Sequence, residues 1–198
     1  MPEVHLQLLG RFQVRRDGQE VPPAAFGGRK VRTLLRVLAV RATDLIPHGE
    51  LAEALWPDRL PADPVANLNV LVNRARRATG DPRLIVTGTG GYALGPCVVD
   101  VTEFLAAADR AAAGEHPAAL RACSAALALW GEPLAEDVYA DWSREPRARL
   151  HRARLDLLER GARAALALGD PRRAAEWAAD AQAVEPLATL GPPSAPSS

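Results

Sequence analysis

Hydrophobic and polar positions follow two different periods in the first 96 residues. Apolar residues cluster over 4–9 and 12–15, and Asp17 begins an Asp-Gly turn signal, which is typical of a small antiparallel sheet. From Arg29 onward, apolar residues recur at three- and four-residue spacing, which predicts a helix. Later elements follow in order: a helix to about residue 42, a short helix over 49–56, a helix from Asp63-Pro64 to about Thr79, and hairpin strands over 83–87 and 91–94.

Beyond residue 100 the whole pattern is helical. Four helices are expected, beginning near residues 101, 117, 141 and 171. Pro117 and Pro171 each open a helix three or two residues after a glycine, a loose repeat that suggests TPR-like stacked hairpins. We therefore expect a mainly α protein with small antiparallel sheets: a winged helix-turn-helix domain over 1–96, an all-α TPR-like domain over 97–187, and a disordered Pro/Ser-rich tail over 188–198.

The charge distribution favours a polyanionic partner for the front half only. The formal net charge is zero, but residues 1–96 hold 13 basic and 9 acidic residues, a net +4, and the remainder holds 11 and 15, a net −4. Two cysteines without metal-ligand spacing indicate a reducing compartment. With no long apolar run, we expect a cytoplasmic protein without membrane association.

The helix over 63–79 carries the candidate chemistry. Its apolar face is formed by Leu68, Leu71, Val72 and Ala75, and at 100° per residue the opposite face carries the candidate base-contacting residues Asn69, Val70, Asn73, Arg74 and Arg77. Asparagine can pair with adenine, arginine with guanine, and valine with a thymine methyl group. The alternative is an ordinary surface helix, whose outer face is also polar. The preceding short helix and the following hairpin favour DNA contact.

A second set of residues is expected to contact DNA phosphates. It comprises Arg29, Lys30 and Arg32 at the start of the first helix, Arg76 and Arg83 beside the third helix, and Thr87 and Thr89 at the hairpin tip. Cations at a helix N-terminus oppose the helix dipole, which suggests a partner for them. Simple solubility is the alternative explanation for the Arg29–Arg32 cluster.

Several stretches in their order make the sequence similar to a known family. The runs LQLLGRFQVRRDG, GGRKVRTLLRVLAV, LAEALWPD, NLNVLVNRARRATGD and IVTGTGGYALG resemble the OmpR/PhoB-type winged helix of the SARP regulators, the actinobacterial antibiotic regulatory proteins. Residues 100–104 and the run ALALWGEPLAEDVYADW at 126–142 resemble the beginning of the bacterial transcriptional activator domain (BTAD) that follows in that family.

The resemblance implies a DNA-binding transcriptional regulator. Its third helix would be the recognition helix, and a pair of protomers, as a homodimer, would bind direct repeats in double-stranded promoter DNA. RNA polymerase recruitment would then activate a biosynthetic gene cluster of secondary metabolism. Because the similarity fades after Pro186-Leu187, the activator domain is expected to be truncated. The alternative is a protein-interaction module or a DNA-binding antagonist that does not activate.

Other features give no support to an enzyme. The glycine-rich run 88–91 is followed by neither Lys-Ser/Thr nor a helix, so it is better explained by a hairpin turn than by a nucleotide loop. The four histidines are scattered, and we expect no metal and no cofactor. An acidic group near residue 137 lies in a loop and is interpreted as solvated; it comprises Glu132, Glu136, Asp137 and Asp141.

Overall fold

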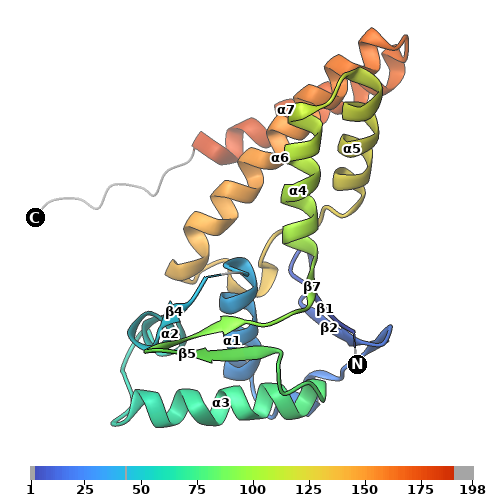
Figure 1. Ribbon diagram of the computed structural model, residues 1–198. Coiled ribbons are helices and arrows are strands. Elements are labelled where there is room, and N and C mark those ends of the chain that lie inside the picture. The colour runs from blue at the N-terminus through green and yellow to red at the C-terminus, as the bar shows by residue number, and fades with distance from the viewer. Residues whose placement is uncertain (1–2, 43, 190–198) are drawn as a thin grey trace, which may run out of the picture. The chain divides into compact units, whose positions relative to one another are not determined.

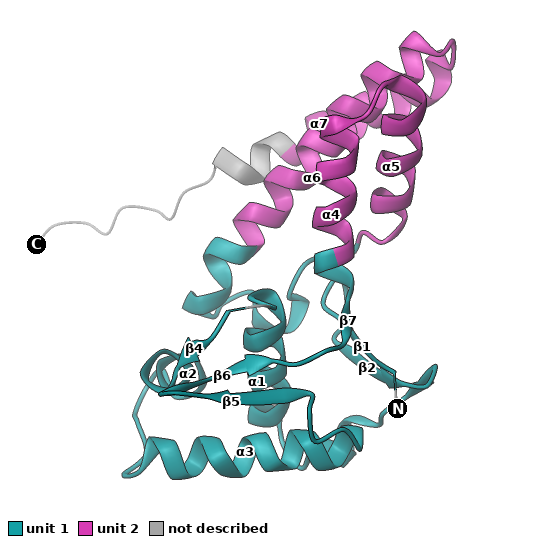
Figure 2. Ribbon diagram, in the orientation of Figure 1, with its two compact units in different colours: residues 1–102, 131–146 teal, residues 103–130, 147–198 magenta. Residues whose placement is uncertain are grey.

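The computed structural model describes residues 3–42 and 44–189, and the chain divides into two compact units (Figure 2). Unit 1 comprises residues 1–102 and 131–146, and unit 2 comprises residues 103–130 and 147–198. These units do not follow the expected division at residue 96, because residues 98–99 and the segment 131–146 pack with the N-terminal part. Of the expected tail, residues 190–198 lie outside the described residues, and residues 188 and 189 are helical.

A four-stranded sheet opens unit 1. Its order is β3-β2-β1-β7, formed by β1 (Val4–Gln7), β2 (Gln13–Arg16), β3 (Gln19–Glu20) and β7 (Val98–Val99). The first three strands are antiparallel as expected, and the turn at Asp17 and Gly18 has positive φ angles of 51° and 79°. Strand β7 pairs parallel with β1, a pairing that two residues without periodicity cannot signal.

Four helices complete the core of the first 96 residues (Figure 1). They are the 3₁₀ helix η1 (Pro23–Phe26), α1 (Arg29–Val40), α2 (His48–Leu55) and α3 (Pro64–Thr79). Helix α3 begins where predicted, because the Asp63 side chain accepts a hydrogen bond from the Ala66 amide at 2.9 Å. It ends at Gly80, whose φ of 67° is the left-handed conformation common at helix C-termini.

A three-stranded sheet of order β4-β6-β5 carries the predicted hairpin. It consists of β4 (Ile46–Pro47), β5 (Ile85–Gly88) and β6 (Gly91–Leu94), and both pairings are antiparallel. Gly91 permits the close approach of β4, since a Cβ atom there would collide with the Ile46 carbonyl oxygen.

The segment 131–146 is an integral part of unit 1. It contains the 3₁₀ helix η2 (Ala135–Asp137), and an isolated β-bridge between Leu9 and Pro133 joins it to the segment that follows β1. The Leu134 amide donates to the Leu8 carbonyl oxygen at 2.9 Å. The Asp100 carboxylate accepts from the amides of Leu8 and Leu9 at 2.8–2.9 Å.

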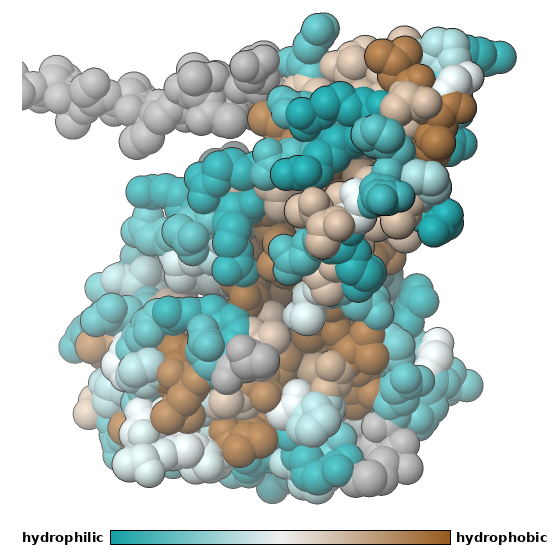
Figure 3. All heavy atoms as spheres, turned by 45° about the horizontal axis from the view of Figure 1, so that its top comes forward, coloured by the Kyte–Doolittle hydropathy of each residue, from teal (hydrophilic) through white to brown (hydrophobic). Residues whose placement is uncertain are grey.

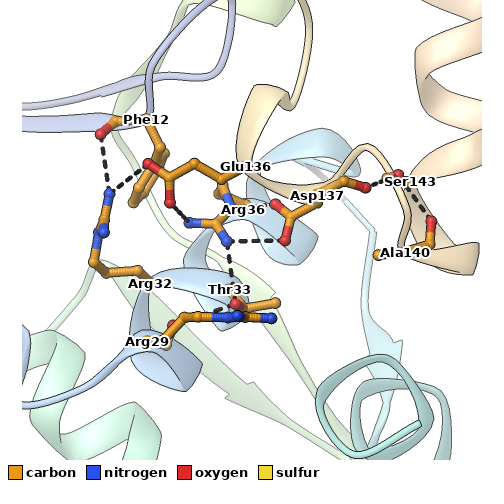
Figure 4. A network of polar contacts seen from close by, with 9 residues as sticks. All are labelled: Phe12, Arg29, Arg32, Thr33, Arg36, Glu136, Asp137, Ala140 and Ser143. Carbon is orange, nitrogen blue, oxygen red and sulfur yellow. Dashed lines mark hydrogen bonds and ion pairs between the residues drawn. The ribbon is translucent and has the colours of Figure 1, made fainter.

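A buried ion-pair network fixes this segment to α1 (Figure 4). The Arg36 guanidinium, only 1% exposed, forms an ion pair with Asp137, donates to Glu136 at 3.0 Å, and donates to the Thr33 hydroxyl at 3.1 Å. The interpretation of Asp137 as solvated is therefore wrong, whereas Glu136 is exposed and forms ion pairs with Arg32 and Arg36. Their partners lie about 100 residues away in sequence, beyond any local pattern.

Unit 2 is helical. It is built from most of α4 (Asp100–Ala113), α5 (His116–Ala128), most of α6 (Asp141–Ala167) and α7 (Pro171–Thr189). Leu158, Ala181 and Val184 form a buried cluster against which Trp177 packs. Figure 3 shows apolar residues scattered among hydrophilic ones on the surface of these helices. Within 3–42 and 44–189, no helix is both long enough and apolar enough to cross a bilayer.

Candidate nucleic-acid interface

Helix α3 has the two faces that its sequence predicts. Leu68, Leu71, Val72 and Ala75 are all buried, which confirms the predicted apolar face. The five candidate base-contacting residues, Asn69, Val70, Asn73, Arg74 and Arg77, are all exposed. Val70 is 48% exposed although it is apolar. The outer face therefore presents an open strip of amide, guanidinium and apolar groups.

The strip has the chemistry of a major-groove surface. Asn69, Asn73 and Arg77 recur every four residues, which aligns them along one side of the helix. Arginine and asparagine form paired hydrogen bonds with purine edges, and a valine side chain can contact a thymine methyl group. An exposed valine between them is explained if a base covers it.

The hairpin β5–β6 is attached to α3 at two points, and the two lie side by side in Figure 1. Near the C-terminal end of the helix, the Arg76 guanidinium donates to the Ile85 carbonyl oxygen at 2.6 Å and to the Thr87 hydroxyl at 3.2 Å. Nearer its N-terminal end, the Tyr92 hydroxyl donates to Asn69 Oδ1 at 2.5 Å. The helix and hairpin thus form one connected surface.

No local sequence pattern indicates a role for Tyr92. The side chain is 2% exposed, and its ring centroid lies 5.1 Å from that of His48. Burial raises the pKa of Tyr92, with the Arg76 charge acting in the opposite direction, so the hydroxyl keeps its proton at neutral pH. A buried tyrosine hydroxyl needs a polar partner, and that requirement is the signal that could have identified it.

The residues beside α3 that are predicted to contact phosphates differ in how far other groups of the protein engage their side chains. Arg76 uses its guanidinium to hold the hairpin, so its first role is internal. Arg83 is exposed and lies 3.4 Å from a carboxylate oxygen of Asp81. Thr87 and Thr89 are exposed on the hairpin, and Thr87 accepts from Arg76.

The basic cluster at the start of α1 is largely engaged within the protein. Lys30 Nζ donates to the Leu55 carbonyl oxygen at 2.8 Å and lies 5.0 Å from the Trp56 ring centroid. It therefore neutralises the C-terminal end of α2, where cations are favourable. Arg32 forms a 2.7 Å ion pair with Glu136, and only Arg29 of the three is exposed without such a contact among the described residues.

The remaining reactive side chains do not form a second site in the described part of the chain. Burial, with a smaller contribution from Asp81, raises the pKa of Cys97 to about 12, so this thiol is protonated at neutral pH. Burial also raises the pKa of Cys123. Among residues 3–42 and 44–189, no group of three His, Cys, Asp or Glu side chains could hold a metal ion.

Comparison with known proteins gives a family match and two regulators. Residues 99–188 match the bacterial transcriptional activator domain. The chain is 31% identical over 159 residues to the regulatory protein AfsR of Streptomyces coelicolor, an alignment that covers 77% of the chain and 16% of AfsR. It is 32% identical over 142 residues to the transcriptional regulatory protein EmbR of Mycobacterium tuberculosis, covering 66% of the chain and 36% of EmbR.

A solved structure extends this similarity to the fold. The structure of M. tuberculosis EmbR in complex with a low-affinity phosphopeptide superposes with a TM-score of 0.78 at 27% identity. The match covers 93% of the chain and 50% of that EmbR chain. The chain thus spans half or less of the relatives it matches.

Proposed function

Because the chain belongs to the SARP-type transcriptional regulators that carry a bacterial transcriptional activator domain, we propose that it binds double-stranded promoter DNA in a sequence-specific manner. In this proposal residues 1–96 act as an OmpR/PhoB-type winged helix. Helix α3 is the recognition helix, and β5–β6 is the wing. The observation that carries the proposal is the exposed Asn/Arg strip of α3 directly beside a hairpin attached to it.

The proposed DNA contacts are of two kinds, contacts with base edges and contacts with phosphates. Asn73, Arg77 and Val70 face the base edges, where hydrogen-bond patterns and the thymine methyl group distinguish sequences. In this proposal the exposed Arg83 and Thr89 contact phosphates, which fixes the position of the helix without sequence preference, and Arg74 belongs with the residues that contact base edges. Arg29 is the residue of the α1 cluster that remains available for such a contact.

The wider regulatory role follows the family. We propose that pairs of protomers bind direct repeats, that the BTAD over 99–188 contributes to recruiting RNA polymerase, and that the bound promoter drives a biosynthetic gene cluster. The acidic balance of residues 97–198 is consistent with a partner other than DNA for that part, since like charge repels a phosphate backbone.

In vitro selection from a randomised duplex library tests DNA binding directly. The purified chain should enrich one family of DNA sequences. Its affinity should fall as salt rises, and a plot of the logarithm of the binding constant against the logarithm of the salt concentration should have a slope near −0.9 per phosphate contacted. Exposed Arg121 on α5 provides a matched control, since Arg121→Ala should leave the enriched sequence and its affinity unchanged. If no duplex is enriched even at low salt, the chain is not a sequence-specific DNA-binding protein.

A promoter-reporter assay separates activation from binding alone. With the enriched repeat placed upstream of a reporter, the proposal expects increased expression that depends on Arg77. Binding that represses the reporter, or leaves it unchanged, would instead identify a DNA-binding antagonist.

A further inference from the structure

The side-chain amide of Asn69 is held from inside the protein. Its Oδ1 atom accepts a 2.5 Å hydrogen bond from the hydroxyl of Tyr92, which is itself buried. Tyr92 lies on the central strand of the β4-β6-β5 sheet, and it is paired with Ile46 on one side and Thr87 on the other. The partner of Asn69 is therefore held in place by strand pairing on both sides, and the amide lies with Oδ1 toward it.

The orientation decides which atoms Asn69 offers outward. The amide oxygen and the amide nitrogen of asparagine are both bonded to Cγ and point in different directions. When the oxygen accepts a hydrogen bond from a group inside the protein, the nitrogen therefore points away from that group. The amide nitrogen carries two N–H donors and no acceptor. Paired hydrogen bonds with adenine need both atoms, because the oxygen must accept from N6 while the nitrogen donates to N7.

We propose that Asn69 acts as a hydrogen-bond donor only, and that Tyr92 is the positioning residue that imposes this specificity. The proposal rests on the DNA-binding function proposed above. The partner of Asn69 is then an acceptor: guanine N7 or O6, thymine O4, or a phosphate oxygen. Adenine recognition by paired hydrogen bonds belongs to Asn73 instead.

Asn73 differs from Asn69 in the hydrogen bonding of its side-chain amide. It lies one turn further along the same exposed face, and within the described part of the chain its side-chain amide makes no hydrogen bond. Both of its polar atoms are therefore available to one base. Two asparagines four residues apart thus have different hydrogen-bonding capacity, although their sequence context on the helix is similar.

Selection with variants of the full chain tests the assignment. If Asn69→Ala removes the sequence preference at one base-pair position, the acceptor that Asn69 contacts is on a base. If it lowers affinity for all sequences about equally, the acceptor is on a phosphate. Asn69→Asp keeps an acceptor for Tyr92 but removes both donors, so it should lose at least as much. Tyr92→Phe should affect the same position, and combining it with Asn69→Ala should add no further loss.

Base analogues then identify the atom that Asn69 contacts. At the position that Asn69→Ala relaxes, removing an acceptor (guanine N7 or thymine O4) should weaken wild-type binding about tenfold and should leave the Asn69→Ala variant unaffected. Removing a donor (adenine N6 or cytosine N4) should produce no loss that depends on Asn69. A donor-dependent loss would overturn the proposal, because it requires an outward Oδ1.

Two further results separate this proposal from the function on which it rests. Asn73→Ala should relax a different position, one that Tyr92→Phe leaves intact, and this relaxation shows that the helix is used. If Asn73→Ala behaves so while Asn69→Ala changes neither preference nor affinity, the donor assignment fails and the DNA-binding function stands. If the wild-type chain enriches no duplex, the function fails first.

Discussion

Individual residues of unit 1 owe their roles to partners far away in sequence. Arg36 and Asp137 are both buried, and each compensates the charge of the other. Arg32 and Glu136 form a neighbouring pair that is more open to solvent, with side chains 17% and 29% exposed. A buried charge left without its partner is far more destabilising than an exposed one.

Removal of Arg36 should therefore lower stability strongly. Arg36→Ala leaves Asp137 buried and unpaired, and we expect the free energy of unfolding to fall by about 3–5 kcal/mol. Arg32→Ala, the comparison variant, should cost less, about 1–2 kcal/mol, because its pair with Glu136 is more open to solvent and one hydrogen bond to the Phe12 carbonyl oxygen is lost as well. Urea denaturation followed by circular dichroism measures both. Equal losses for the two variants would show that burial of the Arg36 pair has no special weight.

At the scale of elements, α3 and the hairpin β5–β6 act as one surface because side chains join them. At one end the Arg76 guanidinium donates to two acceptors, the Ile85 carbonyl oxygen and the Thr87 hydroxyl. Arg74 is exposed on the same helix and provides a comparison of equal charge.

Loss of Arg76 should loosen the hairpin without unfolding the protein. In Arg76→Ala, amide hydrogens of β5 should exchange about tenfold faster, since each lost hydrogen bond costs about 1 kcal/mol. Arg74→Ala should leave their exchange unchanged. Hydrogen exchange measured by NMR on both variants gives the comparison, and unchanged protection of β5 in Arg76→Ala would refute the attachment.

Local periodicity predicted the elements, but it could not predict how they join. The spacing of Leu68, Leu71, Val72 and Ala75 predicts the buried face of α3, because the positions of apolar residues within about ten residues of sequence indicate which side of a helix is buried. Strand β7 has no such window. The contacts of Lys30 with Leu55 and of Tyr92 with Asn69 join separate elements, so a local sequence pattern cannot indicate them. From the pattern alone, Lys30 is predicted to contact a phosphate and Asn69 to contact a base with both of its amide atoms.

At the scale of the whole molecule, charge and fold divide the chain into two kinds of part. The net positive balance lies in residues 1–96, which contain α3 and the hairpin, and the net negative balance lies in the helical remainder. The segment 131–146 belongs to unit 1 although it falls within the BTAD match over 99–188. The family domain and the compact unit therefore overlap along the chain.

The ratio of specific to nonspecific DNA affinity tests the central claim most directly. Fluorescence anisotropy should give a wild-type ratio, for the enriched duplex over a scrambled one, of about 10³ or more at fixed salt. In the Asn73→Ala/Arg77→Ala double variant the ratio should fall by about 10²-fold or more, because each base contact contributes about 1–3 kcal/mol. Should the double variant keep the wild-type ratio, the outer face of α3 does not select the DNA sequence.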